Sequence, residues 1–305
     1  MLRCSVVRRK RGITTLDVAV IAIILTALAY LVYRTTVVID YHWNWSVIPQ
    51  YMFRYDEERG RWVVNLLMQG FITTIKLSLW TTLLAVIVGT VMGFFRTSRS
   101  LFKRLTARSY VELIRNVPPL VLIFIFYFFL SDQIMTVLGV EDFILSLPDR
   151  TRRILAFFMA SPGQFSAFLS AIITLVLYEG AYMTEIIRAG IQSIEKGQWE
   201  ASSASGLSWW QQMRFVILPQ ATRRILPPIA GQLISTIKDS AIVSVVSVQE
   251  LTFQGLELMS STYLTFEVWI TITVLYFILT FSCSLGIRRL EVSLHIEGTK
   301  FKASW

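Results

Sequence analysis

Residues 71–95 read FITTIKLSLWTTLLAVIVGTVMGFF, and Lys76 is the only charged residue among them. A helix rises about 1.5 Å per residue, so about 20 mostly apolar residues are needed to cross about 30 Å of lipid hydrocarbon. This stretch is longer than that requirement and carries its charge near one end. It therefore predicts a transmembrane helix.

Further apolar stretches of similar length lie on both sides of this one. They are 17–39, 110–130, 165–187, 226–246 and 263–286. The first follows a basic start, but its apolar run is longer than the core of a signal peptide, and Tyr30, Tyr33 and Arg34 stand where small residues would precede a cleavage site. We therefore predict an all-α polytopic membrane protein with about six transmembrane helices.

The composition of the whole chain agrees with this class. Of 305 residues, 54% are hydrophobic and 16% are charged, and the mean hydropathy is +0.57. Soluble domains carry about 25% charged residues, so a soluble enzyme is a poor fit, and the apolar content excludes disorder.

The net charge of +9 has an uneven distribution along the chain. Lys and Arg concentrate in 1–16, 96–108, 188–224 and 288–305, which alternate with poorly charged connections if the predicted helices each cross the membrane. Cytoplasmic loops attract such residues. We therefore expect both termini in the cytoplasm and contact with membrane lipid, and no nucleic-acid partner.

The sequence lacks the motifs of several kinds of catalytic, nucleotide-binding and metal-binding site. No phosphate-binding G-x-x-x-x-G-K-[ST] loop and no H-E-x-x-H occurs, and the two histidines, His42 and His295, lie outside the predicted spans. The two cysteines, Cys4 and Cys283, have no metal-ligand spacing. We expect no catalytic residue, no metal site and no cofactor in this chain.

Ionisable residues inside spans are costly, at about 2.5–3.5 kcal/mol each near a helix centre, and often mark a transport pathway. For Glu112 and Lys76 we favour a structural role at span ends, and for Lys238 and Asp239 a structural pair and a pathway role are equally supported. Glu185 and Arg188, three residues apart, can pair on one helix. The candidates for a substrate pathway or its gate are Glu179, Tyr182, Glu185, Arg188, Lys238 and Asp239.

The inner segment 195–228 reads EKGQWEASSASGLSWWQQMRFVILPQATRRILPP. It predicts a short helix before Gly206, a bend at that glycine, and a second helix that starts with Ser208 as N-cap and ends at Pro219. Two short helices at a fixed bend suggest a docking element. The alternative is an interfacial anchor, with Trp209 and Trp210 among the lipid headgroups.

These residues resemble a known family. Glu200-Ala201, Gly206 and Ile217-Leu218-Pro219 match the cytoplasmic "EAA" signature of bacterial ABC-transporter permease subunits. The segments ELIRNVPPLVLIFIFYF (112–128), GAYMTEIIRAGIQSIEKGQ (180–198) and IKDSAIVSVVSVQEL (237–251) look like its polar amino-acid uptake branch. Two departures, Ser202 for the usual alanine and Ser205 for the usual leucine, keep the helix–glycine–helix pattern.

The resemblance implies a permease subunit of an ATP-driven amino-acid importer in the bacterial inner membrane. It divides the chain into an N-terminal helix with an outer interfacial segment (1–65), a permease core (66–290) with a coupling loop (195–222), and a cytoplasmic tail (291–305). Its implied partners are a dimer of ATP-binding cassette subunits, a second permease chain and an extracytoplasmic amino-acid-binding protein, with ATP and Mg bound in the ATPase subunit.

The same resemblance assigns roles inside the loop. Glu200 and Ala201 would contact the ATPase subunit, Gly206 would set the bend, and Ile217 and Pro219 would close the element. Pro227 and Pro228 would break or kink the following span. A self-sufficient ion-coupled transporter or channel that relays ions through Glu179, Lys238 and Asp239 is the alternative, and it leaves the coupling loop unexplained.

Overall fold

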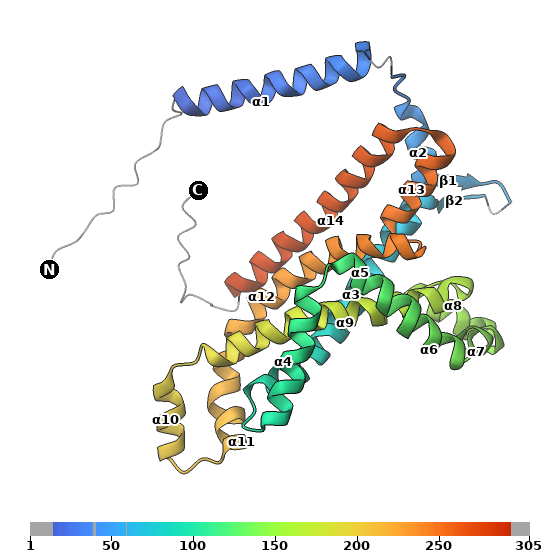
Figure 1. Cartoon of the computed structure of the whole chain (residues 1–305). Coiled ribbons are helices and arrows are strands. Elements are labelled where there is room, and N and C mark those ends of the chain that lie inside the picture. The colour runs from blue at the N-terminus through green and yellow to red at the C-terminus, as the bar shows by residue number, and fades with distance from the viewer. Residues whose placement is uncertain (1–14, 39–40, 59, 294–305) are drawn as a thin grey trace. The chain divides into compact units, whose positions relative to one another are not determined.

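The computed structural model describes residues 15–38, 41–58 and 60–293 (Figure 1). Its contacts divide the chain into two units that meet between Ser46 and Val47. Within the second unit, α2 (Ile48–Met52) packs with α3 (Leu66–Thr97) through Ile48 and Leu67 in one buried cluster. The division after residue 65 stays a prediction. The predicted cytoplasmic tail lies outside the described residues from 294 onward.

The first unit contains one long helix. This is α1 (Thr15–Tyr33), which continues through a π-helical turn at Arg34–Val38. Its apolar side chains are exposed within the unit, as expected for a helix that faces lipid. The end of the first predicted span, at Ile39, lies outside the described residues.

The second unit holds all the other elements. A 3-10 turn at Trp45–Val47 leads into it. In chain order they are α2 (Ile48–Met52), β1 (Phe53–Asp56), β2 (Arg61–Val64), α3 (Leu66–Thr97), α4 (Leu101–Asn116), α5 (Pro119–Phe124), α6 (Asp132–Val137), α7 (Val140–Ser146), α8 (Asp149–Phe158), α9 (Phe165–Gln192), α10 (Lys196–Ala204), α11 (Trp209–Gln211), α12 (Leu218–Asp239), α13 (Leu251–Thr262) and α14 (Thr265–Ser293). The strands form one antiparallel hairpin that pairs Phe53 with Val64.

The prediction of an all-helical membrane protein is confirmed. Five helices in the described part of the chain are long and apolar enough to cross a membrane, and α1 adds a shorter apolar helix. The five are Leu66–Thr97, Pro119–Val137, Pro162–Gln192, Trp209–Val246 and Thr265–Arg289.

The boundaries of the third predicted span are wrong. Residues 110–116 belong to α4, a separate amphipathic helix, and the spanning helix begins only at Pro119. The cause is Pro118, because the ring of a proline disfavours helical backbone at the residue before it. Val117 accordingly has φ −107° and ψ 141°, an extended conformation that separates the two helices.

The prediction that Pro219 ends a helix is also wrong. The helix that starts at Trp209 runs through a π-helical turn at Gln212–Ile217 into α12 without interruption. Pro219 follows that turn as the second residue of α12. Of the break or kink predicted at Pro227 and Pro228, the break is absent, since both lie inside α12.

The centre of the second unit is the pairing of α3 with α9. Gly89 and Gly93 of α3 face Met183 and Ile187 of α9 so closely that a methyl group at Gly93 would lie 2.8 Å from Cγ2 of Ile187. Small residues four apart allow such approach between membrane helices. These contacts hold the two helices in direct backbone proximity.

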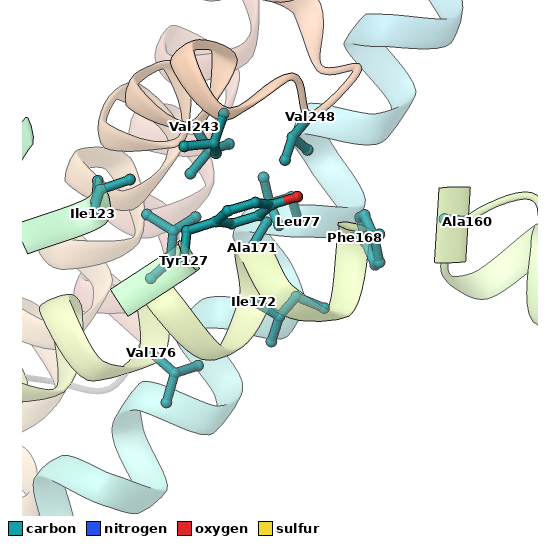
Figure 2. Packing of buried hydrophobic residues seen from close by; sticks show 12 residues of the cluster. Leu77, Ile123, Tyr127, Ala160, Phe168, Ala171, Ile172, Val176, Val243 and Val248 are labelled. Atoms are coloured by element: carbon teal, nitrogen blue, oxygen red, sulfur yellow. The ribbon is translucent and has the colours of Figure 1, made fainter. Parts of the chain in front are cut away.

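A hydrophobic cluster extends this pairing toward α5, the 3-10 turn at Ser240–Val246 and the loop before α13. Figure 2 shows Tyr127 in the middle of this cluster, with Val243 and Val248 on one side and Ile172 on the other. Leu77 of α3 belongs to the same cluster and is fully buried. The cluster joins segments that are far apart in the sequence into one core.

Candidate functional site

The loop helix α10 presents two of its predicted docking residues to solvent. Glu200 and Ala201 are exposed, whereas the next residue, Ser202, is 5% exposed. Trp199 is half-buried and packs on the cluster beneath. The helix is thus fixed on one side and free on the other, and Figure 1 shows α10 and α11 together at one end of α9 and α12.

The bend after α10 is built by backbone geometry and by a cap. Gly206 has φ +75°, a conformation that side-chain-bearing residues rarely adopt. Ser208 then caps α11, as predicted: its Oγ accepts from the N–H of Gln211 at 3.4 Å, while Gln211 Oε1 accepts from the N–H of Ser208 at 2.8 Å. Both sides of this capping box fix the direction of the second helix.

The second arm of the loop is anchored in the core. Ile217 and Met213 are 0% and 1% exposed and pack with Ile191 of α9. Gln220 Nε2 donates to Gln198 Oε1 at 3.2 Å, which links the second arm to α10. Pro219 is exposed beside this anchor. The loop is therefore a pre-formed element rather than an irregular connection.

A buried polar pair joins α9 to α12 within the spanning region. Glu179 is 0% exposed, and its Oε2 accepts from Gln232 Nε2 at 2.7 Å. Asp239 is half-buried and lies within electrostatic reach of both Glu179 and Lys238. Lys238 itself is exposed. The structure thus brings Glu179 and Asp239 together and leaves Lys238 at their margin.

A second polar group lies nearer the loop. The predicted pairing of Glu185 with Arg188 is confirmed at 2.7 Å, and Arg96 of α3 adds a second ion pair to Glu185 at 2.9 Å. Tyr182 lies between Glu179 and Glu185 along α9. Its hydroxyl is 3.3 Å from that of Tyr178, and its ring centre is 5.7 Å from the Arg115 guanidinium.

An open groove runs along α9 and α12 beside this second group. It has a volume of about 710 Å³, and its lining includes Glu185, Arg188, Arg223, Arg224, Pro227 and Pro228. The groove is wide enough for a small solute and carries both signs of charge. It connects the ion pairs of α9 to the part of α12 that follows the loop.

Lys76 and Glu112 have local partners instead. Lys76 Nζ donates to the carbonyl of Ala156 at 2.8 Å, and Glu112 pairs with Arg108 at 2.6 Å on the surface of α4. These contacts agree with the structural roles that we favoured for both residues. No group of three or more His, Cys, Asp or Glu that could hold a metal occurs in the described ranges.

Three partners could not be found from the sequence pattern. Gln232 and Arg96 are ordinary residues of their own helices, and only the packing brings them to Glu179 and Glu185. Glu250 is the third: its carboxylate is 0% exposed and accepts from the N–H groups of Thr252 and Phe253 at 2.9 and 2.8 Å. Glutamate is not among the usual N-cap residues, so no sequence signal marked this cap.

Glu250 also joins three helices at the end of the molecule opposite the loop. Tyr276 of α14 donates to its carboxylate at 2.8 Å, and Thr74 of α3 at 3.4 Å. Glu250 lies outside the spanning helices, and burial raises its pKa from the ordinary 4.5 to about 7. The hydrogen bonds from the backbone N–H groups oppose this rise and are outweighed by the burial.

Comparisons with known proteins agree with these features. Residues 83–294 match the family described as "Binding-protein-dependent transport system inner membrane component". The glutamine transport system permease protein GlnP of Escherichia coli (strain K12) is 34% identical, and the match covers 76% of this chain and 94% of GlnP. The glutamate/aspartate import permease protein GltJ of the same organism is 29% identical, with 84% and 96% covered.

Two solved structures are similar as well. A chain of the crystal structure of an amino acid ABC transporter with histidines matches with a TM-score of 0.60 and 32% identity, over 75% of this chain and 94% of that one. A chain of the methionine ABC transporter MetNI in an inward-facing conformation matches with a TM-score of 0.59, over 75% of this chain and 96% of that one. At 18% identity, the second match shows the fold alone.

Proposed function

This chain belongs to the family of binding-protein-dependent transport system inner membrane components, and we propose that its α10–α11 loop transmits the work of an ATPase partner to its spanning helices. The chain is the multi-pass, non-catalytic permease component of an amino-acid ABC transport system in the inner membrane. Membership implies ATPase and binding-protein partners.

The observation that carries the proposal is the two-sided structure of α10. Its outer side offers Glu200 and Ala201 to a partner, and its inner side is fixed by Ser202 and by the anchor at Ile217. A partner that pushes on the outer side therefore moves the start of α12 with it. Such coupling requires that the docked subunit bind two transporter conformations with different affinity.

The test is a charge reversal at the docking surface. Glu200→Lys should abolish substrate-stimulated ATP hydrolysis in the reconstituted complex, or release the ATPase subunit during purification. Glu257→Lys makes the same change at another exposed glutamate, on α13, and should leave both readouts unchanged. Normal coupling in Glu200→Lys would refute the docking role.

The remaining assembly follows from the same proposal. Two permease chains, identical or different, would pair in the membrane over two ATP-binding cassette subunits, which would hold ATP and Mg. The loop and both termini would face the cytoplasm, since Lys and Arg concentrate in the segments on that side. Thiol labelling of Ser203→Cys from each side of the membrane tests this orientation.

For the transported solute we propose glutamine or a closely related polar amino acid. Relatives named for glutamine and for glutamate/aspartate transport support this class. The two groups of polar residues on α9 and α12 suit a zwitterion. Glu179 and Asp239 can bind its ammonium group, and Arg188 can bind its carboxylate. Tyr182 and Lys238 would line or gate the path between them. Uptake of labelled glutamine, glutamate and histidine by the complex tests this choice.

A further inference from the structure

A basic trough lies at the loop end of the spanning helices. It consists of two adjoining cavities of about 440 and 290 Å³, and both include Arg96 and Glu112 in their walls. The wall residues belong to α3, α4 and α9, which pack together; Figure 1 shows the course of α4 beside the other two helices. The charged residues of their walls are Arg96, Arg104, Arg108, Arg115, Arg188, Glu112 and Glu185.

The trough has more positive charge than its own carboxylates neutralise. Glu112 pairs with Arg108, and Glu185 pairs with Arg96 and Arg188. Arg104 has no carboxylate within ion-pair distance among the described residues. Arg115 lies over the ring of Tyr182 and acts on Glu185 electrostatically without forming an ion pair in the part of the chain that the structure describes. Five arginines against two glutamates leave a concentrated positive charge, which attracts an anion with several acceptor oxygens.

The walls of the larger cavity also include apolar side chains. Leu101 and Leu105 line it and are 60% and 51% exposed, and Phe102, between them on α4, is 79% exposed. Basic and apolar residues therefore share one short helix that begins directly after the spanning helix α3. Such a helix lies at the boundary between headgroups and acyl chains.

We propose that this trough binds an anionic phospholipid of the adjacent leaflet. The phosphate of the headgroup lies among Arg104, Arg108 and Arg96, and the start of an acyl chain lies over Leu101 and Leu105. The apolar wall favours a lipid over a free anion, because a free anion gains nothing from exposed leucines. Basic pockets between spanning helices on one membrane face recognise lipid headgroups in this way.

The trough is separate from the proposed coupling surface. Glu200 and Ala201 are on α10, whereas Arg104 and Leu105 are on α4. Arg104 and Leu105 are not among the candidate residues of the solute path. A failure of the Glu200 experiment therefore leaves this inference standing, and the reverse also holds.

The test measures lipid binding to the intact transporter complex. The complex is purified in mild detergent, stripped of lipid, and titrated with phosphatidylglycerol or phosphatidylcholine while native mass spectrometry counts bound molecules. We expect a preference of about tenfold or more for phosphatidylglycerol, and about fivefold weaker binding of it by Arg104→Gln, since one basic residue near a membrane contributes about 1 kcal/mol.

Two further variants separate the possible sources of binding. Arg99→Gln removes the same charge from an exposed residue that precedes α4 but does not line the trough, and it should leave binding unchanged. Leu105→Asn should weaken the binding of phosphatidylglycerol without changing the binding of inorganic phosphate, because only the lipid contacts that wall.

Several outcomes would overturn the proposal. Equal losses in Arg99→Gln and Arg104→Gln would mean diffuse surface attraction instead of a site. Displacement of phosphatidylglycerol by millimolar inorganic phosphate, with no effect of Leu105→Asn, would mean a site for free anions. Loss of a protein subunit from Arg104→Gln with unchanged lipid binding would mean a protein contact.

Discussion

The two sides of α9 are built differently. On the side of α3, Gly89 and Gly93 bring the backbones together, and a methyl group at Gly89 would lie 2.8 Å from the carbonyl carbon of Met183. On the side of α12, the loop end is also closely packed, since Gly190 faces Ile225 and isoleucines of both helices share one buried cluster. Deeper in the span the link includes the hydrogen bond between Glu179 and Gln232. Close packing along a helix allows little relative movement, whereas a polar link can be exchanged.

This difference indicates which parts move together. We infer that the helix pair α3–α9 forms the fixed frame and that α12, which continues directly from the loop, can shift against it. The open groove lies at the second boundary, where Arg188 of α9 and Arg223 of α12 face the same space. Substitutions on the two sides of α9 should therefore affect different properties.

The largest expected effect comes from closing the space between α3 and α9. Gly89→Leu should prevent stable folding, because the new side chain has no room beside Met183, and overpacking of this kind costs about 1–3 kcal/mol or more. Protein yield and thermal unfolding in detergent measure it. Gly286→Leu, at an exposed site on α14 with open space, is the control and should behave like the original protein. Equal stability of the two variants would contradict the interpretation that α3 and α9 form a fixed frame.

A smaller effect is expected on the α12 side. Glu179→Gln keeps the shape of the side chain and a partner for Gln232 but removes the carboxyl group, so stability should change by about 1 kcal/mol or less. Uptake should fall roughly tenfold, because the carboxyl group that we propose to meet the ammonium group of the solute is lost. Substrate uptake and thermal unfolding of the same preparation separate the two effects. A large loss of stability with normal uptake would reverse our interpretation.

The end of the frame opposite the loop gives a prediction about pH. The pKa of Glu250 is raised from 4.5 to about 7, so the folded protein holds this proton more tightly than the unfolded chain. Stability from this group is therefore greatest at low pH and falls as pH rises from about 4.5 to about 7. Glu250→Gln should flatten this part of the pH profile of thermal unfolding. An unchanged slope in the variant would show that another group titrates there.

The smallest effect is expected from the ion pair between Arg96 and Glu185. Both side chains are partly exposed, at 18% and 17%, and Glu185 keeps its second partner Arg188. Arg96→Gln should therefore cost about 1 kcal/mol or less, as for most accessible ion pairs. The midpoint of thermal unfolding measures it. A loss of stability as large as that of Gly89→Leu would show that this ion pair is needed for the packing of α3 on α9.

Much of the fold could be predicted because each spanning helix requires a long apolar run, which is visible in the sequence. The apolar runs at 71–95 and 165–187 lie within α3 and α9, the run at 263–286 overlaps α14 in all but its first two residues, and Ser208 was recognisable as a helix cap. Family membership also sets aside the alternative of a self-sufficient ion-coupled transporter.

Both errors in helix boundaries concern backbone geometry, which hydropathy does not describe. Hydropathy joined α4 to the helix beyond Pro118, and proline rules alone ended a helix at Pro219 that the structure continues. The partners of the buried acids were unpredictable for another reason. Gln232 is 53 positions from Glu179, and only the packing of α9 against α12 makes them neighbours.

The π-helical turn at Gln212–Ile217 lets this helix hold one residue more than a regular α-helical turn. A single deletion within it would restore regular α-helix and leave the direction of the α12 side chains nearly unchanged, because the wider turn already accommodates the extra residue. A deletion in α12 between this turn and Gln232 would instead rotate Gln232 by about 100° about the helix axis, away from Glu179. The turn is therefore the place where this helix tolerates a change of length best.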